Sequence, residues 1–414
     1  MNFGELVEAL TPDFYSYPWL PLQRATLTDS FVTMQWSDGL SLTAYSLWLA
    51  ENSLGMGLES KTRESMIDPA DLPDPSALRA AKVGPNGELE LMWRVPDRAA
   101  QKTTMHPGWL RHVADQRHRP ASYLPAPEMW TAATFMHPPS VDGRDILVDR
   151  DALTLWLTLL TRYGLALLRN TPATPDFLLA LAAKVGPVRS TNFGEVFDVK
   201  ADIDPTSTAN TGLNLGQHTD LPTRETPPGF QFLHCIANTV AGGRSRMTDG
   251  FAVVAELREH FPIDYEALTT LRWVFFNRSR TEDHRWSGPV IDHVDDGYPL
   301  TIRAFYPVRA FPDMAPEDVP RAYAAMRRFS SVAHDPRFQV STPFVPGDLV
   351  GFDNRRILHG RDAFEAGGGE RHLRGCYIDQ DDVYSRLRVL TRAVEQHTAQ
   401  TSQSIYPHDR GHRP

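Results

Sequence analysis

Residues 229–240, GFQFLHCIANTV, begin a long series of short predicted strands, and this series decides the fold. Further segments rich in β-branched and aromatic residues follow, separated by turn residues: RWVFFNRS (272–279), PVIDHV (289–294), PLTIRAFY (299–306), FQVSTPFV (338–345), LVGFDNRRILHG (349–360) and RHLRGCYID (371–379). One predicted helix, 316–334, interrupts them. A doubly wound α/β sheet would need regular alternation of strands and helices. The series therefore predicts a mainly β fold with flanking helices, a jelly roll (double-stranded β-helix) or a related β-sandwich.

Upstream of these strands the sequence predicts two helices and a separate small domain. Helical spacing of apolar residues predicts helices at 149–163 and 175–185. Nearer the N-terminus, 25–49 is typical of a β-hairpin, and 87–94 of a strand before a short helix at 107–113. We therefore expect five segments: an N-terminal extension (1–22), a small β-rich domain (23–116), a Pro- and His-rich linker (117–142), a jelly-roll domain (143–395) and a polar tail (396–414).

The composition favours a globular protein that acts on a small molecule. The 414 residues include 42 Lys and Arg against 51 Asp and Glu, and this net charge of −9 argues against a nucleic-acid or anionic-membrane partner. We expect neither a signal peptide nor a membrane span, and hence a cytoplasmic protein. The two cysteines, Cys235 and Cys376, are too far apart for a CxxC pair. They favour buried thiols in a reducing compartment, with a disulfide as the alternative.

Histidine and carboxylate are the residues left to carry chemistry, because the P-loop, dinucleotide, zincin and hydrolase-elbow motifs are missing. A non-haem Fe(II) site needs two imidazoles and one carboxylate on one face of the metal. Two His-x-Asp segments qualify, 218–220 and 293–295, and chance alone supplies about two. The second runs into Asp296-Gly297 and favours a hairpin turn. For the first, metal binding and a structural role are equally compatible with the local sequence.

A later His and Arg break this tie. His359 could supply the second imidazole, and Arg371 follows it in an extended segment. Strand alternation places Arg371, Leu373, Gly375 and Tyr377 on one face, so that Arg371 and Arg374 point in opposite directions. A guanidinium beside the metal could form a bidentate pair with the free carboxylate of 2-oxoglutarate. The alternative is that both arginines lie on the surface of an edge strand.

Three blocks of sequence together resemble a known family. They are 209–251, which contains GQHTDLP; 346–364, PGDLVGFDNRRILHGRDAF; and 371–390, RHLRGCYIDQDDVYSRLRVL. Their order and spacing resemble the gamma-butyrobetaine hydroxylase branch of the taurine dioxygenase-like Fe(II)/2-oxoglutarate oxygenases. The similarity extends over about 145–391, and more loosely over 25–116, the small N-terminal domain of that family.

The resemblance implies a role for each matching residue. It makes His218, Asp220 and His359 the iron ligands, and it makes Arg371 the partner of the distal 2-oxoglutarate carboxylate, with Ser245 as a hydroxyl donor to it. The implied cofactors are Fe(II), 2-oxoglutarate and O2. The implied reaction couples decarboxylation of 2-oxoglutarate to hydrogen abstraction from a substrate. Because related halogenases lack the carboxylate, Asp220 favours hydroxylation or desaturation. A homodimer is also implied.

Two departures from the family stand out. Its N-terminal domain usually carries a zinc site of three cysteines and one histidine, but the matching segment 47–73 contains no cysteine, so we expect no structural zinc. The family also holds a trimethylammonium group in an aromatic cage. The matching substrate positions are Phe193, Phe197, Asn210 and Tyr377, with Phe305 and Tyr306 where the family has asparagines.

These departures predict an oxygenase that hydroxylates or desaturates a small molecule other than gamma-butyrobetaine. The first alternative is a hydroxylase of the gamma-butyrobetaine or trimethyllysine type with a degenerate cage. Alternatives of another class are a non-catalytic metal-binding β-roll and a zinc hydrolase, and both leave Arg371 without a function.

Overall fold

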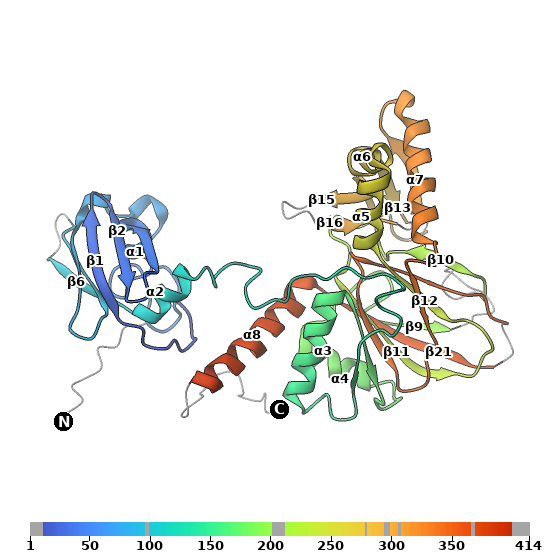
Figure 1. Cartoon of the computed structure of the whole chain (residues 1–414), viewed down its shortest axis with the longest axis horizontal. Helices are drawn as coiled ribbons and strands as arrows, with labels where there is room; N and C mark the ends of the chain where they lie inside the picture. The colour runs from blue at the N-terminus through green and yellow to red at the C-terminus, as the bar shows by residue number, and fades with distance from the viewer. Residues whose placement is uncertain are drawn as a thin grey trace. The chain divides into compact units, whose positions relative to one another are not determined.

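A computed structural model describes residues 11–95, 99–200, 212–277, 280–293, 299–304, 308–365 and 369–399 (Figure 1). The described residues form two compact units. One contains the chain up to Tyr123 together with the residues from Arg392 onward, and the other contains Leu124–Thr391. No helix in the described part of the chain has the length and apolar character needed to cross a membrane.

The first unit contains two three-stranded antiparallel sheets and two short helices. One sheet has β1 (Leu22–Thr28), β2 (Phe31–Trp36) and β3 (Ser41–Tyr45), and the other has β4 (Leu78–Val83), β5 (Leu89–Trp93) and β6 (Gln101–Met105). The helices are α1 (Ser46–Glu51) and α2 (Pro107–Ala114). Trp36, Trp93 and Trp109 are buried in its core.

The hairpin predicted at 25–49 is only partly correct. The strands around its turn, β2 and β3, pair as expected. However, the part predicted as one strand before the turn is divided between two strands, β1 and β2. The chain reverses between them, where Asp29 has a left-handed φ of 52°. The end of the predicted hairpin is helix α1.

Two facing sheets build the second unit. A six-stranded sheet has the order β7 (Ser140–Asp142), β8 (Leu165–Arg169), β19 (Leu349–Asp353), β11 (Phe230–Asn238), β21 (Arg371–Ile378) and β9 (Val196–Lys200). A four-stranded sheet has the order β10 (Leu215–His218), β20 (Ile357–Arg361), β12 (Ser245–Asp249) and β18 (Gln339–Thr342). Buried residues of both sheets, among them Leu233 and Met247, share one hydrophobic cluster. This arrangement fits the predicted jelly roll.

Helices α3 (Arg150–Tyr163), α4 (Phe177–Val185) and α8 (Gln380–Ala399) pack on the six-stranded sheet in a second hydrophobic cluster. The first two confirm the helices predicted at 149–163 and 175–185. Asp149 caps α3, since its carboxylate accepts backbone N–H bonds, and Gly164 ends it with a left-handed φ of 69°. Both cysteines lie on strands of this sheet, buried and free, which excludes the disulfide alternative.

A mostly helical subdomain lies between β12 and β18 in the sequence (Figure 1). It packs α5 (Gly250–His260), α6 (Pro262–Thr270) and α7 (Val319–Ala333) around one apolar cluster. Its strands are β13 (Arg272–Phe276), β14 (Arg285–Gly288), β15 (Ile291–His293), β16 (Pro299–Ile302) and β17 (Arg309–Asp313). The prediction of a single helix in this region is wrong. The helix at 316–334 exists as α7 after a short 3₁₀ turn at Pro316–Asp318, but two helices precede it.

The predicted linker 117–142 belongs in large part to the second unit. Trp130 and Phe135 are buried with their rings stacked, the centroids 4.5 Å apart. The backbone N–H of Trp130 donates to Asp249, and β7 at the end of the segment pairs with β8. Two aromatic side chains in this segment therefore enter the core, which a composition rich in Pro and His does not reveal.

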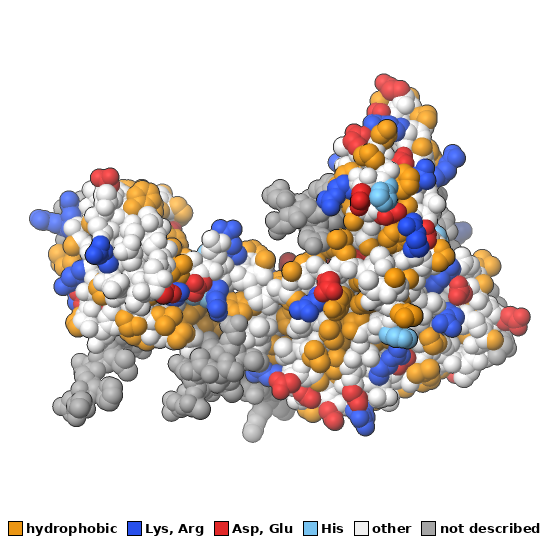
Figure 2. Space-filling view, in the orientation of Figure 1, with side chains coloured by type: hydrophobic (Ala, Val, Ile, Leu, Met, Phe, Trp, Pro, Cys, Tyr) orange, Lys and Arg blue, Asp and Glu red, His pale blue; other side chains and the backbone are white. Residues whose placement is uncertain are grey.

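Charged side chains of both signs are interspersed on the face shown in Figure 2, with apolar side chains between them. One ion pair is instead fully buried. The guanidinium of Arg356 donates to both carboxylate oxygens of Asp249 at 2.9 and 2.8 Å. It also donates to the carbonyl oxygens of Glu128 and Arg162. This group therefore joins the start of β20, the start of α5 and the end of α3.

Removing one partner of this pair is expected to destabilise the second unit strongly. Arg356→Leu leaves the Asp249 carboxylate buried without its counterion, so the free energy of unfolding should fall by about 3–5 kcal/mol. Urea denaturation followed by circular dichroism measures this. Arg144→Leu is the control, because Arg144 and its partner Asp142 are exposed, and a surface pair is worth at most about 1 kcal/mol. Equal losses in the two variants would contradict the prediction.

Candidate active site

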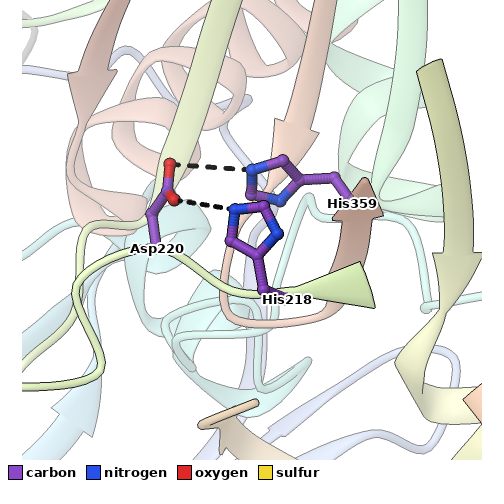
Figure 3. Close-up of side chains that lie close together, drawn as sticks. All are labelled: His218, Asp220 and His359. Carbon is purple, nitrogen blue, oxygen red and sulfur yellow. Dashed lines mark ion pairs between the residues drawn. The ribbon is translucent and has the colours of Figure 1, made fainter. Parts of the chain in front are cut away.

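Two histidines and an aspartate converge between the sheets (Figure 3). His218 ends β10, Asp220 follows two residues later, and His359 lies opposite His218 in the antiparallel pair of β10 and β20. Nε2 of His218 lies 3.3 Å from Oδ1 of Asp220, and Nε2 of His359 lies 3.7 Å from Oδ2. Each residue offers one ligand atom, and the three ligand atoms all lie within 4.8 Å of one another.

This donor set fits a divalent metal ion. Two imidazole nitrogens and one carboxylate oxygen on one face leave further coordination positions open, as in non-haem Fe(II) sites. No other group of three His, Cys, Asp or Glu side chains with this closeness occurs among the described residues. Within the alternative segment His293–Asp295, the Asp295 position lies outside the described residues.

The ionisation states of His359 and Asp220 suit metal binding. Burial, and then the neighbouring His218, lower the pKa of His359 to about 3, so its imidazole stays neutral at ordinary pH. Burial works against ionisation of Asp220, but His359, His218 and the Tyr377 hydroxyl outweigh it and hold the pKa of Asp220 well below its usual range. Nδ1 of His218 lies 2.9 Å from the carbonyl oxygen of Gly216 and donates to it, which leaves the Nε2 lone pair for a metal.

Thr219, between His218 and Asp220, ties both residues to the helical subdomain. Its hydroxyl donates to the carbonyl oxygen of Ile302 at 2.9 Å and accepts from the N–H of Ala304 at 3.0 Å. Thr219 is 1% exposed. Since alternate residues of an extended segment point to opposite sides, this anchor turns His218 and Asp220 together toward the cavity.

The triad opens onto a cavity of about 210 Å³ between the sheets. Arg371 and Ser245, predicted to hold the co-substrate, both line it and are buried, 7% and 6% exposed. Burial lowers the pKa of Arg371, and no described carboxylate forms an ion pair with it. Its Nε atom is buried and has no hydrogen-bond partner among the described residues. A guanidinium in this state is a carboxylate-binding group.

Strand alternation in β21 is as predicted. Arg371, Leu373 and Tyr377 line the cavity, whereas Arg374 makes an ion pair with Asp198 on the neighbouring strand at 3.6 Å.

Sequence reasoning missed Arg361, a second arginine in the cavity. It lies on β20, two residues after His359 and opposite Ser245 of β12. Burial, followed by the like charge of Arg371, lowers the pKa of Arg361 to about 10. The guanidinium groups of Arg361 and Arg371 lie over the same ring, Phe364, at 4.8 and 5.5 Å from its centroid. The period of two along a strand, applied to His359, is the signal that could have identified it.

The substrate positions predicted from the resemblance divide into two groups. Phe193, Phe197 and Tyr377 all line the cavity. The ring centroids of Phe193 and Phe197 lie 6.1 Å apart, and those of Phe197 and Tyr377 lie 5.1 Å apart. The Tyr377 hydroxyl also donates to Oδ2 of Asp220 at 2.7 Å, a contact that the sequence does not reveal. The remaining predicted positions, Asn210, Phe305 and Tyr306, lie outside the described residues.

Comparison with known proteins shows where this chain belongs. Residues 121–377 match the model of a family described as "Taurine catabolism dioxygenase TauD, TfdA family". The chain is 37% identical over 383 residues to the gamma-butyrobetaine dioxygenase of Pseudomonas sp. (strain AK-1), covering 92% of this chain and 99% of that one. It is 32% identical over 282 residues to the human gamma-butyrobetaine dioxygenase, covering 66% of this chain and 71% of the relative.

It is also 31% identical over 270 residues to the mitochondrial trimethyllysine dioxygenase of Rattus norvegicus, covering 63% of each chain. These matches confirm the resemblance predicted from the three sequence blocks. The chain belongs to the TauD, TfdA family and is a 2-oxoglutarate-dependent dioxygenase that uses iron(II) and O2.

Proposed function

We propose that this dioxygenase hydroxylates or desaturates an unactivated C–H bond of a small cationic molecule. His218, Asp220 and His359 hold the iron, and Arg371 with Ser245 holds the distal carboxylate of 2-oxoglutarate. One observation carries the proposal: the triad, the buried arginine and three aromatic rings all line the same cavity. A non-catalytic metal site or a zinc hydrolase would have no use for a buried guanidinium that lacks a described counterion.

The side chains divide the task among them. His218, Asp220 and His359 would hold the iron, which when bound would supply the chemistry that couples 2-oxoglutarate to O2. The guanidinium of Arg371 orients the co-substrate through its free carboxylate, because a planar fork pairs with a carboxylate in two parallel hydrogen bonds. Apolar walls such as Leu233, Met247 and Leu373 exclude water around the reacting groups.

The aromatic rings favour a positively charged substrate group. Phe193, Phe197 and Tyr377 present a chain of ring contacts along the cavity wall. Each ring face can attract a trimethylammonium group by about 0.5–2 kcal/mol. Similarity to the Pseudomonas gamma-butyrobetaine dioxygenase over nearly the whole of both chains supports gamma-butyrobetaine as the first candidate substrate.

A bulkier or less carboxylate-dependent substrate is the second candidate. The sequence favours it, because Asn210 stands where the family has tyrosine, and Phe305 and Tyr306 stand where it has asparagines that hold the substrate carboxylate. A trimethyllysine-type substrate belongs instead with gamma-butyrobetaine, since both carry a trimethylammonium group. A homodimer and a cytoplasmic location, implied by the resemblance and the composition, complete the proposal, and light scattering of the purified chain tests the dimer.

The metal content follows from the donor sets. The full chain, reconstituted anaerobically, should bind about one Fe(II) per chain and no structural zinc, since segment 47–73 offers no thiolate. Elemental analysis after separate exposure to Fe(II) and to Zn(II), each followed by desalting, measures this, because the triad itself would take zinc from a mixture of the two ions. His218→Ala is the matched variant: it should lose the iron. Zinc retained in that variant at one ion per chain would reveal a second metal site and contradict the expectation.

Arg371 and Arg374 form a natural pair for testing co-substrate binding, since they lie on one strand but on opposite faces. Arg371→Met should raise the KM for 2-oxoglutarate by about 30-fold or more, because loss of a buried charge partner costs about 2–5 kcal/mol. Arg374→Met should change it by less than about threefold. Oxygen consumption at varied 2-oxoglutarate measures both values. Equal effects in the two variants would argue against the assigned role of Arg371.

The role of the aromatic wall, formed by Phe193, Phe197 and Tyr377, can be tested with two ligands of the same shape that differ in charge. Gamma-butyrobetaine and 5,5-dimethylhexanoate differ only in the quaternary atom, nitrogen in one and carbon in the other. Phe197→Leu should weaken binding of the trimethylammonium compound by about 5–30-fold, the equivalent of about 1–2 kcal/mol, and weaken the carbon isostere, which lacks the positive charge, much less. The spectral change of the anaerobic Fe(II)/2-oxoglutarate complex reports binding. Similar losses for both ligands would show that the ring acts by shape alone.

A further inference from the structure

Asp220 is held in position differently from His218 and His359. His218 and His359 lie on paired strands, whose backbone hydrogen bonds fix them. Asp220 lies beyond the end of β10, and the next residue, Leu221, has a left-handed φ of 51° directly before Pro222. A non-glycine residue in this region costs about 1–3 kcal/mol and persists only where the surrounding structure holds it. Other groups must therefore hold Asp220 in place.

Asn354 holds the backbone of Asp220. Its side chain is fully buried, and its Oδ1 accepts the N–H of Asp220 at 2.7 Å. Its Nδ2 donates to the carbonyl oxygen of Asp220 at 3.0 Å and to that of Pro228 at 3.1 Å. The amide thus pairs with the peptide groups on both sides of Asp220, as a neighbouring strand would. The main chain of the ligand is fixed, but its carboxylate could still rotate.

Tyr377 holds the carboxylate. Its hydroxyl donates to Oδ2 of Asp220 at 2.7 Å, while Oδ1 is the oxygen that lies 3.3 Å from Nε2 of His218. The tyrosine is 1% exposed, so this hydrogen bond is shielded from solvent.

We propose that the Tyr377 hydroxyl is a positioning group that occupies Oδ2 and leaves Oδ1 of Asp220 as the single ligand oxygen. This inference rests on the proposed role of Asp220 as an iron ligand. A carboxylate released from the hydroxyl could offer both oxygens to the metal and thereby take a position that 2-oxoglutarate or O2 needs. The ring of the same residue lies 5.1 Å from Phe197, so one side chain serves both the aromatic wall and the metal ligand.

The test removes the hydroxyl and keeps the ring. Metal-free full-length Tyr377→Phe is titrated with Co(II), without 2-oxoglutarate or substrate. Its Kd should be about 10–100-fold weaker than that of the unmodified chain, the usual effect of losing a hydrogen bond to a metal ligand. At saturation its Co(II) absorption bands should also shift, because the carboxylate coordinates differently. The melting temperature should change little, which separates positioning from a loss of fold.

Tyr384→Phe is the matched control. Tyr384 belongs to the same unit and packs against Phe230 at 5.9 Å between centroids, but it does not line the cavity. Its variant should bind Co(II) like the unmodified chain. If Tyr377→Phe also keeps the unmodified Kd and absorption bands, the inference is overturned and Tyr377 is only part of the wall.

Failure of the proposed function has a different signature. If gamma-butyrobetaine and its isostere both fail to bind while Tyr377→Phe still weakens Co(II), the inference stands and the proposed substrate class is wrong. If His218→Ala binds Co(II) as tightly as the unmodified chain, the metal lies elsewhere, and both the iron assignment and the inference are overturned.

Discussion

The pairing register of β20 is the constraint on which the active site depends. On one side His359 lies opposite His218 of β10, and on the other it lies opposite Met247 of β12. The same register places Arg361 opposite Ser245. Because side chains alternate along a strand, a slip by one residue would turn both His359 and Arg361 away from the cavity. Leu358, on the opposite face of β20, belongs to the apolar cluster of the helical subdomain, so such a slip would also take an apolar side chain out of that cluster.

The turn before β20 is what holds this register. Arg356, immediately before the strand, makes the buried ion pair with Asp249, which is the last residue of β12 and caps helix α5. The N–H of Gly250 donates to the Arg356 carbonyl oxygen at 3.0 Å, and a Cβ on Gly250 would lie only 2.4 Å from that oxygen. Asn354, in the same turn, binds the backbone of Asp220. One short turn thus connects the strand with His359 to the segment with Asp220.

Local periodicity in the sequence was enough to predict part of this arrangement. It predicted the face of β21 that carries Arg371 and Tyr377, and it predicted helices α3, α4 and α7. In each case the period of the strand or helix can be read from the spacing of residues within one short segment. It did not predict α5 and α6, whose apolar residues follow no clear single face, or the burial of Trp130. Spacing alone did not predict the metal triad, since two His-x-Asp segments fit it; the turn residues after Asp295 and the later His359 and Arg371 favoured the first segment, and the family resemblance then implied the roles.

The contacts of Asn354 and Tyr377 with Asp220 could not be predicted from the sequence at all. Asn354 makes two hydrogen bonds to Asp220 and Tyr377 makes one, both across more than 130 residues of sequence, and neither contact leaves a periodic signal. Asn354 falls within the block 346–364 that resembles the family, but neither its role nor its partner follows from the sequence.

The two ends of β21 give the cavity an electrostatic direction. Arg371 begins the strand and Tyr377 lies six residues later, a separation of about 20 Å along the backbone. Two buried guanidinium groups, Arg361 and Arg371, therefore lie toward one end, and the aromatic wall lies toward the other. A dianionic co-substrate is attracted to the first end, while the cationic group of the proposed substrate would be repelled from it and attracted to ring faces at the second. Under that proposal, the fold sorts two small molecules by charge before any specific contact between substrate and chain discriminates further.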